Sequence, residues 1–416
     1  MSLSVLLLES IHLGVQKTFS DCGYVVKSLS FSLSESNLIS LCQSEHINVL
    51  GVRSKTVVSR RVLEACPDLA LIGCFCIGTD TVDLEAAREF GVVVFNAPFS
   101  SGRSVAELCL GEIICLSRQL CDKSGEMHRG VWSKSSVGCH EIRGRVLGVV
   151  GYGNIGCQIS ILAEAFGMQV LYFDIASKTS IGNSKSCSSL ESVLKESDFV
   201  TLHVPDTHLT RGMIGKDQIG IMKPGSLLLN ASRGGVVDLD ALREALLKGH
   251  LGGCAIDVHP DEPISNTQSW ISPLQGLKNV ILTPHIGGST EQAQERIGLD
   301  LSSKIKRFVE SGEVMDSVNF PTITLSSNGS KFRICHIHRN VPGVLKKLNT
   351  ILDSVNIVGQ SLNTQGQVGI CLLDCDQVAS KEAIQEIWDM AETIRVYCIP
   401  EHEDHIFVGK SLEGGA

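Results

Sequence analysis

The sequence predicts an α/β protein with two doubly wound parallel-sheet domains followed by a smaller antiparallel βαββαβ module. Short continuous apolar runs alternate with helical periodicity up to about residue 290, which is typical of parallel strands covered on both faces. A glycine-rich turn joins one of these runs to a helix. Beyond a polar segment at 321–330 the order of elements changes. These three observations define the class.

Length and composition limit the function. The 416 residues are too many for one core, and 43% hydrophobic with 19% charged residues indicate a folded globular protein. A net charge of −9 gives no basic field for nucleic acid. No apolar run approaches the roughly 18 residues of a membrane span. The 16 cysteines are scattered without zinc-type spacing, so we expect reduced thiols, no metal and a cytoplasmic location.

The first domain is expected to be discontinuous, with residues 1–97 and 291–320. Its strands are predicted at 5–8, 48–52, 69–73 and 92–95, and its helical segments at 38–42, 60–65 and 84–90. Pro98 discourages helix at the preceding residue and marks the crossing to the next domain. A helix at 291–311 is expected to carry the chain back.

The stretch 145–174 predicts a dinucleotide site. An apolar strand runs into Gly151, Gly153 and Gly156, and a helix and a second strand lead to Asp174. The glycines serve the tight turn, the approach to a pyrophosphate and the packing of helix on strand. Asp174 can accept hydrogen bonds from ribose hydroxyls and would repel a 2′-phosphate, which favours NAD. The alternative is a glycine-rich loop in an ordinary α/β protein.

The remaining elements complete a Rossmann-type domain at 98–290 and a ferredoxin-like module at 331–400. In the first of these, strands are expected at 146–150, 170–173, 199–204, 226–230, 253–258 and 279–282. In the module, strands are expected at 332–338, 357–363, 368–374 and 393–398, and helices at 342–354 and 383–391. Residues 321–330 are a predicted linker and 401–416 a tail. Trp132 either fills a local gap or anchors a subunit interface.

Three polar residues follow strands of the Rossmann-type domain, where a ligand crevice opens. Arg233 offers a planar fork for a carboxylate, and His285 can exchange a proton with a hydroxyl near neutral pH. Glu262 can orient the imidazole and stabilise its cation. This set suits the oxidation of an α-hydroxy acid. The plainer readings are a surface salt-bridge partner for Arg233 and a turn residue for Glu262.

Four phrases of the sequence, VLGVVGYGNIG, LLLNASRGGVVD, CAIDVHPDEP and LTPHIGGST, resemble the D-isomer-specific 2-hydroxyacid dehydrogenases. The resemblance covers almost the whole chain and implies that Arg233, Glu262 and His285 are catalytic, with His285 as proton donor and acceptor. It also implies contacts to NAD from Gly151, Gly153, Asn154, Ile155, Gly156, Asp174, Ala231, Ser232, Arg233, Asp257, His285, Gly287 and Gly288.

The phrases GVRSKT, IGCFCIGTDTVDL and FNAPFSSGRSVAEL resemble the branch of this family that oxidises 3-phosphoglycerate for serine biosynthesis. Arg53 and Lys55 follow the predicted strand 48–52 at its crevice-facing end, where the plainer reading is two solvated loop cations. The likeness reverses this reading for Arg53, which is expected to bind the substrate phosphate with Ser54 and Lys55 beside it. Lys134, beside Trp132, is a further candidate that can reach a neighbouring subunit. The chain has Ser101-Gly102 where relatives often carry Asn-Thr. That departure can change one substrate hydrogen bond and admit 2-oxoglutarate as a further substrate.

The C-terminal module resembles an ACT regulatory domain. In serine-inhibited members, the residues corresponding to His338, Asn340 and Asn356 bind L-serine across a two-fold interface, which implies L-serine as effector and a homo-oligomer, a dimer or tetramer. The plainer readings are Asn340 as a helix N-cap and His338 as an edge-strand residue. His336 and His338 lack further metal ligands.

Two rival functions remain for the whole chain. The first is a reductase for hydroxypyruvate, glyoxylate or a branched keto acid, and the second is an NAD-sensing scaffold that binds proteins.

Overall fold

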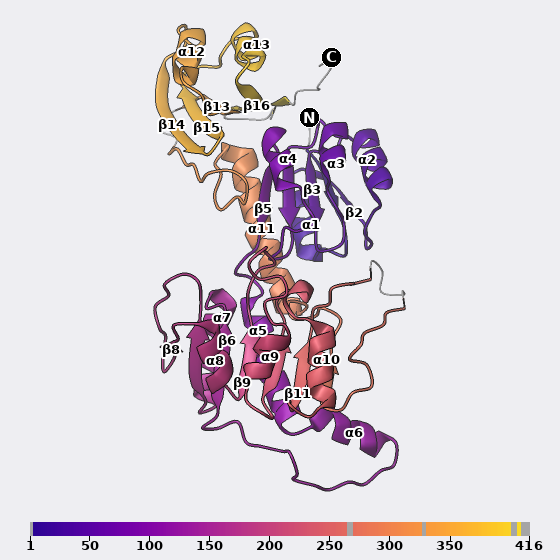
Figure 1. The fold of residues 1–416 in the computed structure, drawn as a ribbon. Helices are drawn as coiled ribbons and strands as arrows, with labels where there is room; N and C mark the ends of the chain where they lie inside the picture. The colour runs from indigo at the N-terminus through magenta and orange to yellow at the C-terminus, as the bar shows by residue number, and fades with distance from the viewer. Residues whose placement is uncertain (1–2, 264–268, 327–329, 401–405, 409–416) are drawn as a thin grey trace. The chain divides into compact units, whose positions relative to one another are not determined.

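The computed structural model describes residues 3–263, 269–326, 330–400 and 406–408. It divides into two compact units, one of residues 1–100 with 294–416 and one of residues 101–293. Figure 1 shows the elements of each unit in chain order. We describe each unit by itself.

The first unit begins with a parallel five-stranded sheet in the order β2-β1-β3-β4-β5, the flavodoxin-like order. The strands are β1 (Ser4–Leu7), β2 (Val25–Ser28), β3 (Val49–Val52), β4 (Leu71–Cys74) and β5 (Val93–Asn96). The helices are α1 (Leu13–Asp21), α2 (Glu35–Ser44), α3 (Arg60–Ala65), α4 (Leu84–Glu89) and α11 (Glu291–Ser311). The edge strand β2 escaped the sequence prediction because its residues are half-buried or exposed and form no continuous apolar run.

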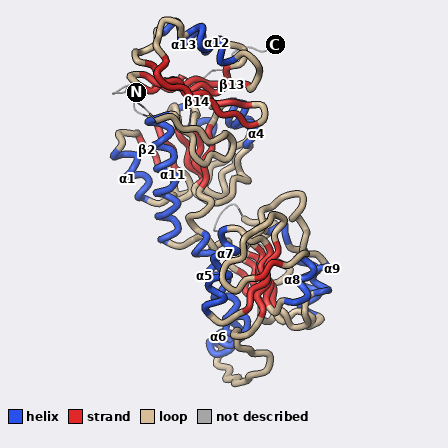
Figure 2. Tube along the Cα trace, turned by 90° about the vertical axis from the view of Figure 1, so that its left-hand side faces the viewer, coloured by secondary structure: helices blue, strands red, loops and turns tan. Residues whose placement is uncertain are grey.

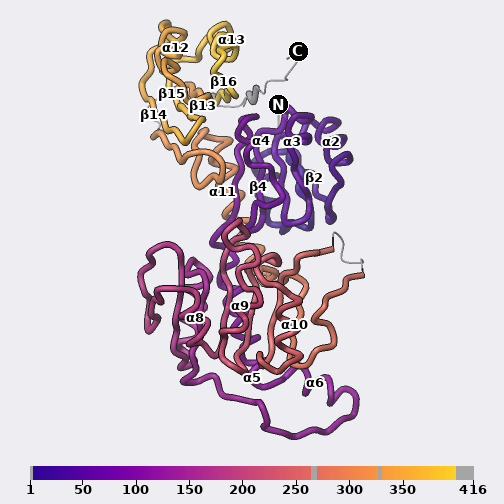
Figure 3. Tube along the Cα trace, viewed as in Figure 1, coloured from indigo at the N-terminus to yellow at the C-terminus, as the bar shows by residue number. Residues whose placement is uncertain are grey.

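Two layers of helix cover this sheet. Buried residues of α1 and α11 share one core with the sheet, and those of α2, α3 and α4 share the core of the opposite face. Figure 3 shows the orange α11 beside the indigo and violet chain of the first sheet, so the late helix does return to the first sheet.

The second unit holds a parallel seven-stranded sheet in the order β12-β11-β10-β9-β6-β7-β8. The strands are β6 (Val146–Val150), β7 (Gln169–Phe173), β8 (Lys185–Ser186), β9 (Phe199–Leu202), β10 (Leu227–Asn230), β11 (Gly253–Ile256) and β12 (Val280–Leu282). The helices are α5 (Gly102–Ser117), α6 (Leu120–His128), α7 (Asn154–Ala165), α8 (Leu190–Glu196), α9 (Lys216–Ile221) and α10 (Leu239–Leu247). Figure 2 shows α5 and α7 on one face and α8 and α9 on the other.

Counted from β6, this sheet has the Rossmann order 3-2-1-4-5-6 with one further strand. The predicted six strands are all present. The seventh, β8, is two exposed residues long and carries no apolar signal, and the short α9 also escaped prediction. All strands run parallel, but the order in which they are added reverses beside β6, and such a switch point opens a ligand crevice at the carboxyl ends of β6 and β9.

The C-terminal module is an antiparallel sheet in the order β14-β15-β13-β16-β17. Its strands are β13 (Phe332–Arg339), β14 (Ile357–Gln365), β15 (Val368–Cys375), β16 (Thr393–Pro400) and β17 (Ile406–Val408), and its helices are α12 (Val344–Ile351) and α13 (Lys381–Asp389). The βαββαβ order is therefore as expected. Within the stretch expected to be a tail, β17 pairs with β16, while residues 401–405 and 409–416 lie outside the described part.

The module packs on the first sheet through one shared core. Alternate residues of its strands, including Ile337, Ile370 and Tyr397, join a buried cluster with β1, β5 and α11. Arg395 is 4% exposed and donates hydrogen bonds to the carbonyls of Leu69 (2.6 Å) and Pro67. The module is thus fastened to the first domain by polar contacts as well as by apolar burial.

Two surface features complete the description. Among the described residues, no helix combines the length and the apolar character that crossing a membrane requires. Trp132 is 80% exposed, so the reading in which it fills a local gap is wrong for this chain. Exposed apolar side chains accompany it on α6 and the following loop, namely Leu120, Met127, Val131 and Val137.

Candidate active site

The glycine turn after β6 has little tolerance for side chains at two of its three glycines. Gly151 has φ +90°, and a Cβ there would lie 2.3 Å from the His203 carbonyl oxygen. A Cβ on Gly156 would lie 2.3 Å from the Gly151 carbonyl oxygen. Around Gly153, in contrast, a Cβ would meet nothing within 4 Å, and no side chain caps the N-terminus of α7. The first turn of α7 therefore faces open space and can receive a phosphate.

The carboxylate of Asp174, the residue after β7, stabilises this turn by hydrogen bonding. Its Oδ2 accepts a hydrogen bond from the Tyr152 N–H at 2.8 Å, and its Oδ1 accepts one from the Ala176 N–H. The Tyr152 ring is buried and stacks on Tyr172 with centroids 3.8 Å apart. Tyr152 was not singled out from the sequence. The structure gives it a supporting role because its ring fills the space beneath the turn.

Arg233 follows β10 in a loop that Asn230 shapes. The Asn230 side chain is buried, donates to the Arg233 carbonyl at 3.0 Å, and accepts hydrogen bonds from the N–H and hydroxyl of Ser232. Such a local side-chain hydrogen bond turns the backbone at the strand end. Asn230 also escaped the sequence analysis, although its place at the end of an apolar strand is a signal that could have found it.

His285 lies in a strained turn held by a buried carboxylate. Its φ is +54°, in the left-handed region that non-glycine residues rarely adopt. Asp257, 1% exposed, accepts hydrogen bonds from the Thr283 hydroxyl (2.6 Å) and from the N–H groups of Ile286 and Gly287 (2.8 Å each). Both Asp257 oxygens are thus engaged with the protein, which supports a positioning role beside the expected cofactor contact.

Glu262 and His285 form the predicted carboxylate–imidazole pair, with Oε2 and Nδ1 2.8 Å apart. This hydrogen bond, opposed in part by burial, raises the pKa of His285 above its usual value. Burial alone would raise the pKa of Glu262, but the bond and charge of His285 outweigh it and hold that pKa below its usual value. The His285 side chain remains 41% exposed, so a substrate can reach it. Arg233 is close enough to His285 to oppose its protonation.

Arg53, Ser54 and Lys55 form the turn after β3 in the first unit, and Glu9 holds this turn. The Glu9 carboxylate is 8% exposed and accepts hydrogen bonds from the N–H groups of Ser54 and Lys55 (3.0 Å each) and of Thr56 (2.7 Å). These three N–H groups are therefore engaged within the protein, and only the side chains of the turn remain to contact a ligand. Glu9 was not predicted as part of this turn, although it lies only two residues past the carboxyl end of β1.

Lys134 belongs to the second unit and is exposed in the loop after α6. It shares this loop with the exposed Trp132. The prediction that it reaches a neighbouring subunit remains a prediction.

The three predicted regulatory residues do not meet within one chain. Asn340 follows β13 and donates to the Gly366 carbonyl in the β14–β15 hairpin, whereas Asn356 precedes β14 at its other end. At about 3.3 Å per residue, the nine residues of β14 put these ends roughly 25–30 Å apart. The N-cap of α12 is Gly343, so the N-cap reading of Asn340 is wrong.

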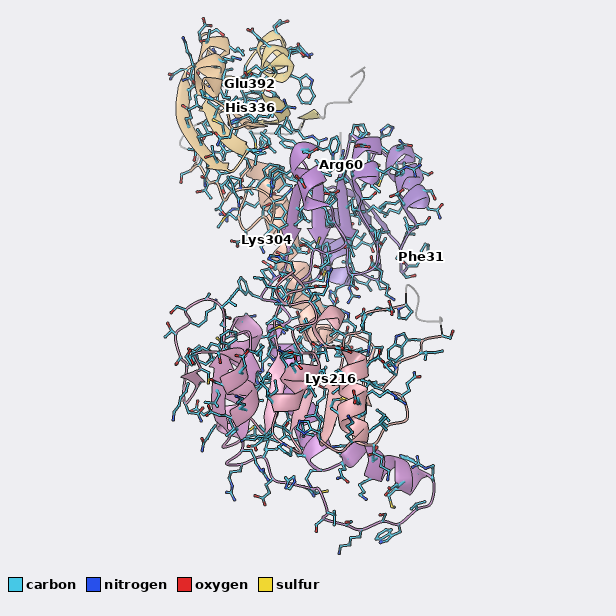
Figure 4. The ribbon with its side chains drawn as sticks, viewed as in Figure 1. Phe31, Arg60, Lys216, Lys304, His336 and Glu392 are labelled. Carbon is cyan, nitrogen blue, oxygen red and sulfur yellow. The ribbon has the colours of Figure 1, made fainter. Side chains whose placement is uncertain are left out.

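The imidazoles of the module are buried rather than edge-exposed. His336 and His338 stack with ring centroids 5.1 Å apart, and Figure 4 labels His336 within the module. The His336 Nε2 lies 2.7 Å from the Thr393 hydroxyl. Burial lowers the pKa of both histidines. Two buried ring nitrogens, His336 Nδ1 and His338 Nε2, have no hydrogen-bond partner within the described part of the chain.

The arrangement of turn, crevice and His–Glu pair belongs to one class of enzyme. Residues 110–287 match the family described as the D-isomer specific 2-hydroxyacid dehydrogenase, NAD binding domain. The chain is a member of the D-isomer-specific 2-hydroxyacid dehydrogenase family and uses NAD as its cofactor.

Relatives and solved structures narrow the class. The chain is 52% identical to a D-3-phosphoglycerate dehydrogenase of Dictyostelium discoideum, over 94% of this chain and 96% of that protein. It is 44% identical to the D-3-phosphoglycerate dehydrogenase of Escherichia coli K12, over the same shares. Among solved structures, D-lactate dehydrogenase of Aquifex aeolicus, complexed with NAD and lactic acid, is 29% identical with a TM-score of 0.66. It covers 76% of this chain and 100% of its own.

Alanine at two glycines separates the folding role of the turn from its binding role. We expect Gly151→Ala to destabilise the fold by a few kcal/mol, since its Cβ would overlap a backbone carbonyl at a positive φ. Gly153→Ala is expected to fold normally but to bind NADH at least tenfold more weakly, because the methyl group occupies phosphate space. Thermal unfolding and NADH fluorescence titration measure the two effects. Normal NADH affinity in Gly153→Ala would place the phosphates elsewhere.

Proposed function

We propose that this protein is an NAD-dependent D-3-phosphoglycerate dehydrogenase that oxidises 3-phospho-D-glycerate to 3-phosphohydroxypyruvate. The observation that carries the proposal is the Glu262–His285 pair, 2.8 Å apart in the same unit as Arg233 and the glycine turn. The relatives named D-3-phosphoglycerate dehydrogenase, which match nearly the whole chain, support this substrate.

The proposed chemistry assigns one task to each residue. Arg233 binds the substrate carboxylate, for which a guanidinium is geometrically suited. Glu262 holds His285 through Nδ1, so Nε2 takes the proton of the 2-hydroxyl during oxidation and returns it during reduction. NAD, when bound, accepts the hydride. Glu262 also stabilises the imidazolium that forms, which the raised pKa of His285 supports.

Cofactor contacts are proposed for the crevice of the second unit. The N-terminus of α7 suits the pyrophosphate, and Asn154 and Ile155 begin that helix. Each carboxylate oxygen of Asp174 can accept a second hydrogen bond, and the ribose hydroxyls of NAD are suited to donate it. The remaining proposed contacts come from the three loops that carry the proposed catalytic residues, after β10, β11 and β12: Ala231, Ser232, Arg233, Asp257, His285, Gly287 and Gly288.

Selection of the phosphorylated substrate is proposed for Arg53, with Ser54, Lys55 and Lys134 contributing. Arg53 is half-buried. Its guanidinium donates a hydrogen bond to the Glu9 carbonyl at 3.3 Å, and its own carbonyl accepts one from the Cys76 thiol. A cationic side chain that is already held in place loses little conformational entropy when it binds a phosphate. Glyoxylate and hydroxypyruvate carry no phosphate, so a reductase for either of them does not need a cation at the position of Arg53. Reduction of 2-oxoglutarate is a secondary proposal based on Ser101-Gly102.

Regulation by L-serine is proposed for the module, which we assign as an ACT domain. His338 and Asn340 lie at one end of β14 and Asn356 at the other, so a complete site needs two chains. The exposed apolar residues around Trp132 support a second subunit contact and hence a dimer or tetramer. A cytoplasmic location is proposed with this biosynthetic role.

Replacing Glu262 tests the His–Glu assignment. In the reductive direction His285 must be protonated, so the rate falls as pH rises through its pKa, which Glu262 raises. Glu262→Gln is expected to move this fall to lower pH and to lower kcat by on the order of 10²-fold or more. The measurement is a pH profile of NADH oxidation with 3-phosphohydroxypyruvate. An unshifted profile would show that Glu262 does not control the titrating group.

Replacing Arg53 tests the substrate. Arg53→Gln is expected to raise KM for 3-phosphohydroxypyruvate by on the order of 10–100-fold, the worth of a charged hydrogen-bonded pair, and to leave hydroxypyruvate kinetics unchanged. Arg61→Gln is the matched control, because Arg61 is exposed and pairs with Glu35. Equal effects on both substrates would contradict phosphate recognition. Turnover of either substrate would dispose of the scaffold alternative.

L-serine inhibition tests the module. Millimolar L-serine is expected to inhibit the wild type, and Asn356→Ala to abolish this response without changing uninhibited turnover. Mixing two variants, each defective in the regulatory site, tests whether a complete site needs two chains. Hetero-oligomers of His338→Ala and Asn356→Ala chains keep one complete regulatory site per pair of chains, so they are expected to regain partial inhibition. Insensitivity of the wild type would remove the effector proposal and leave the catalytic proposal intact.

A further inference from the structure

A buried imidazole that was not predicted from the sequence lies where three loops of the second unit meet. His259 follows β11, is 8% exposed and belongs to the same loop as Glu262. Its backbone N–H donates a hydrogen bond to Glu262 Oε1 at 3.2 Å. The other oxygen of this carboxylate, Oε2, lies 2.8 Å from His285 Nδ1. The main chain of His259 therefore holds the carboxylate oxygen of Glu262 that His285 does not use.

The ring of His259 reaches the loop that carries His285. Its Nε2 lies 3.0 Å from the Thr283 carbonyl oxygen, and because a carbonyl oxygen only accepts, Nε2 carries the hydrogen. Thr283 is two residues before His285, and its hydroxyl donates to Asp257, the carboxylate that supports the same turn. One side chain thus joins the loop after β11 to the loop after β12.

The third loop packs against the main chain of His259. A Cβ on Gly234, the residue after Arg233, would lie 2.2 Å from the His259 carbonyl carbon. A side chain there would overlap the backbone, so only glycine permits this close approach of the two loops. The loops after β10, β11 and β12, which carry the three proposed catalytic residues, therefore all contact His259.

Packing alone does not account for a histidine at this position. The ring lies against Trp270, with centroids 4.3 Å apart and planes inclined at 59°, and a phenyl ring would fill the same space. The His259 Nδ1, in contrast, is buried and finds no hydrogen-bond partner among the residues that the structure describes. An unpaired buried acceptor lowers stability, which favours a role for the bond that Nε2 makes.

We propose that His259 is a positioning residue for the reaction, because it links the loop of Glu262 to the loop of His285 and so aligns the carboxylate with the imidazole. His259 acts through this pair and exchanges no proton with the substrate. The inference rests on the catalytic roles proposed above for Glu262 and His285. Without the ring bond the two loops are less firmly joined, and the hydrogen bond that raises the pKa of His285 weakens.

Three substitutions separate positioning from packing. His259→Gln can bring an amide N–H near the position of Nε2, His259→Asn is too short to do so, and His259→Phe keeps the ring without a donor. We expect His259→Phe and His259→Asn to lower kcat for reduction of 3-phosphohydroxypyruvate about 3–10-fold, the loss expected for one neutral hydrogen bond, with KM and NADH affinity unchanged. His259→Gln is expected to stay within about twofold of the wild type.

The pH profile is a readout that a packing role would not change. The reductive rate falls as pH rises through the pKa of His285, which Glu262 raises. His259→Phe is expected to move this fall to lower pH, in the direction of Glu262→Gln but by less, and His259→Gln to leave it in place. His250→Phe is the matched control with an expected wild-type profile, because the His250 Nε2 also lies 3.0 Å from a carbonyl oxygen, that of Ile219, before the amino end of β11.

A double-mutant cycle tests whether His259 acts through the pair. In a Glu262→Gln background, His259→Phe is expected to lower kcat by less than about twofold further, since the alignment that it supports is already lost. Fully multiplying effects would overturn the inference. If His259→Phe does not fold, equal kcat values and pH profiles for His259→Gln and His259→Asn overturn it instead.

The same measurements distinguish this inference from the proposal on which it rests. An effect of Glu262→Gln on kcat and pH profile, without any effect of His259→Phe, would remove only the positioning role of His259. No effect of Glu262→Gln would remove the catalytic proposal and the positioning role together.

Discussion

The turn that carries His285 depends on the buried carboxylate of Asp257. Hydrogen bonds to a charged acceptor contribute about 1.5–3 kcal/mol each. Asp257 accepts three of them, from Thr283, Ile286 and Gly287. A left-handed backbone at a non-glycine residue costs on the order of 1–3 kcal/mol. The carboxylate can therefore hold His285 at φ +54°, from which its ring reaches Glu262. Without the hydrogen bonds to Asp257, the backbone at His285 would not be held in the conformation that brings its imidazole to Glu262.

The same device appears at the turn that carries Arg53. Glu9 accepts three backbone N–H groups with its two oxygens, from residues just past the carboxyl end of β3. Glu9 itself has φ +63°. In both units a buried carboxylate at a strand end shapes the loop of another strand, and the loop presents a cationic or titratable side chain. Parallel sheets make this possible because their carboxyl ends share one edge.

The departure at Ser101-Gly102 has a structural counterpart in the second unit. A Cβ on Gly102 would lie 2.4 Å from the Asn154 side-chain nitrogen, so the glycine leaves room for the first residue of α7. Gln158 in turn donates to the Asn154 side chain at 3.3 Å. The glycine therefore bears on the position of Asn154, a proposed cofactor contact.

Local patterns of the sequence determined most of the elements, the two parallel sheets, the antiparallel module, the glycine turn and the candidate residues Arg233, Glu262 and His285. Apolar runs, glycine spacing and strand-end polar residues are properties of neighbouring residues, so they can be read along the chain. The edge strands β2 and β8 gave no such signal, since their side chains are largely exposed.

Only the tertiary structure decided which partners support the site. Glu9 lies 44 or more residues from the turn that it holds, and Asn230 acts through its buried amide. It also decided that His338 and Asn356 do not meet in one chain, which depends on the length and direction of β14. Contacts between distant segments follow from how sheets and helices pack, and a one-dimensional pattern does not contain that information.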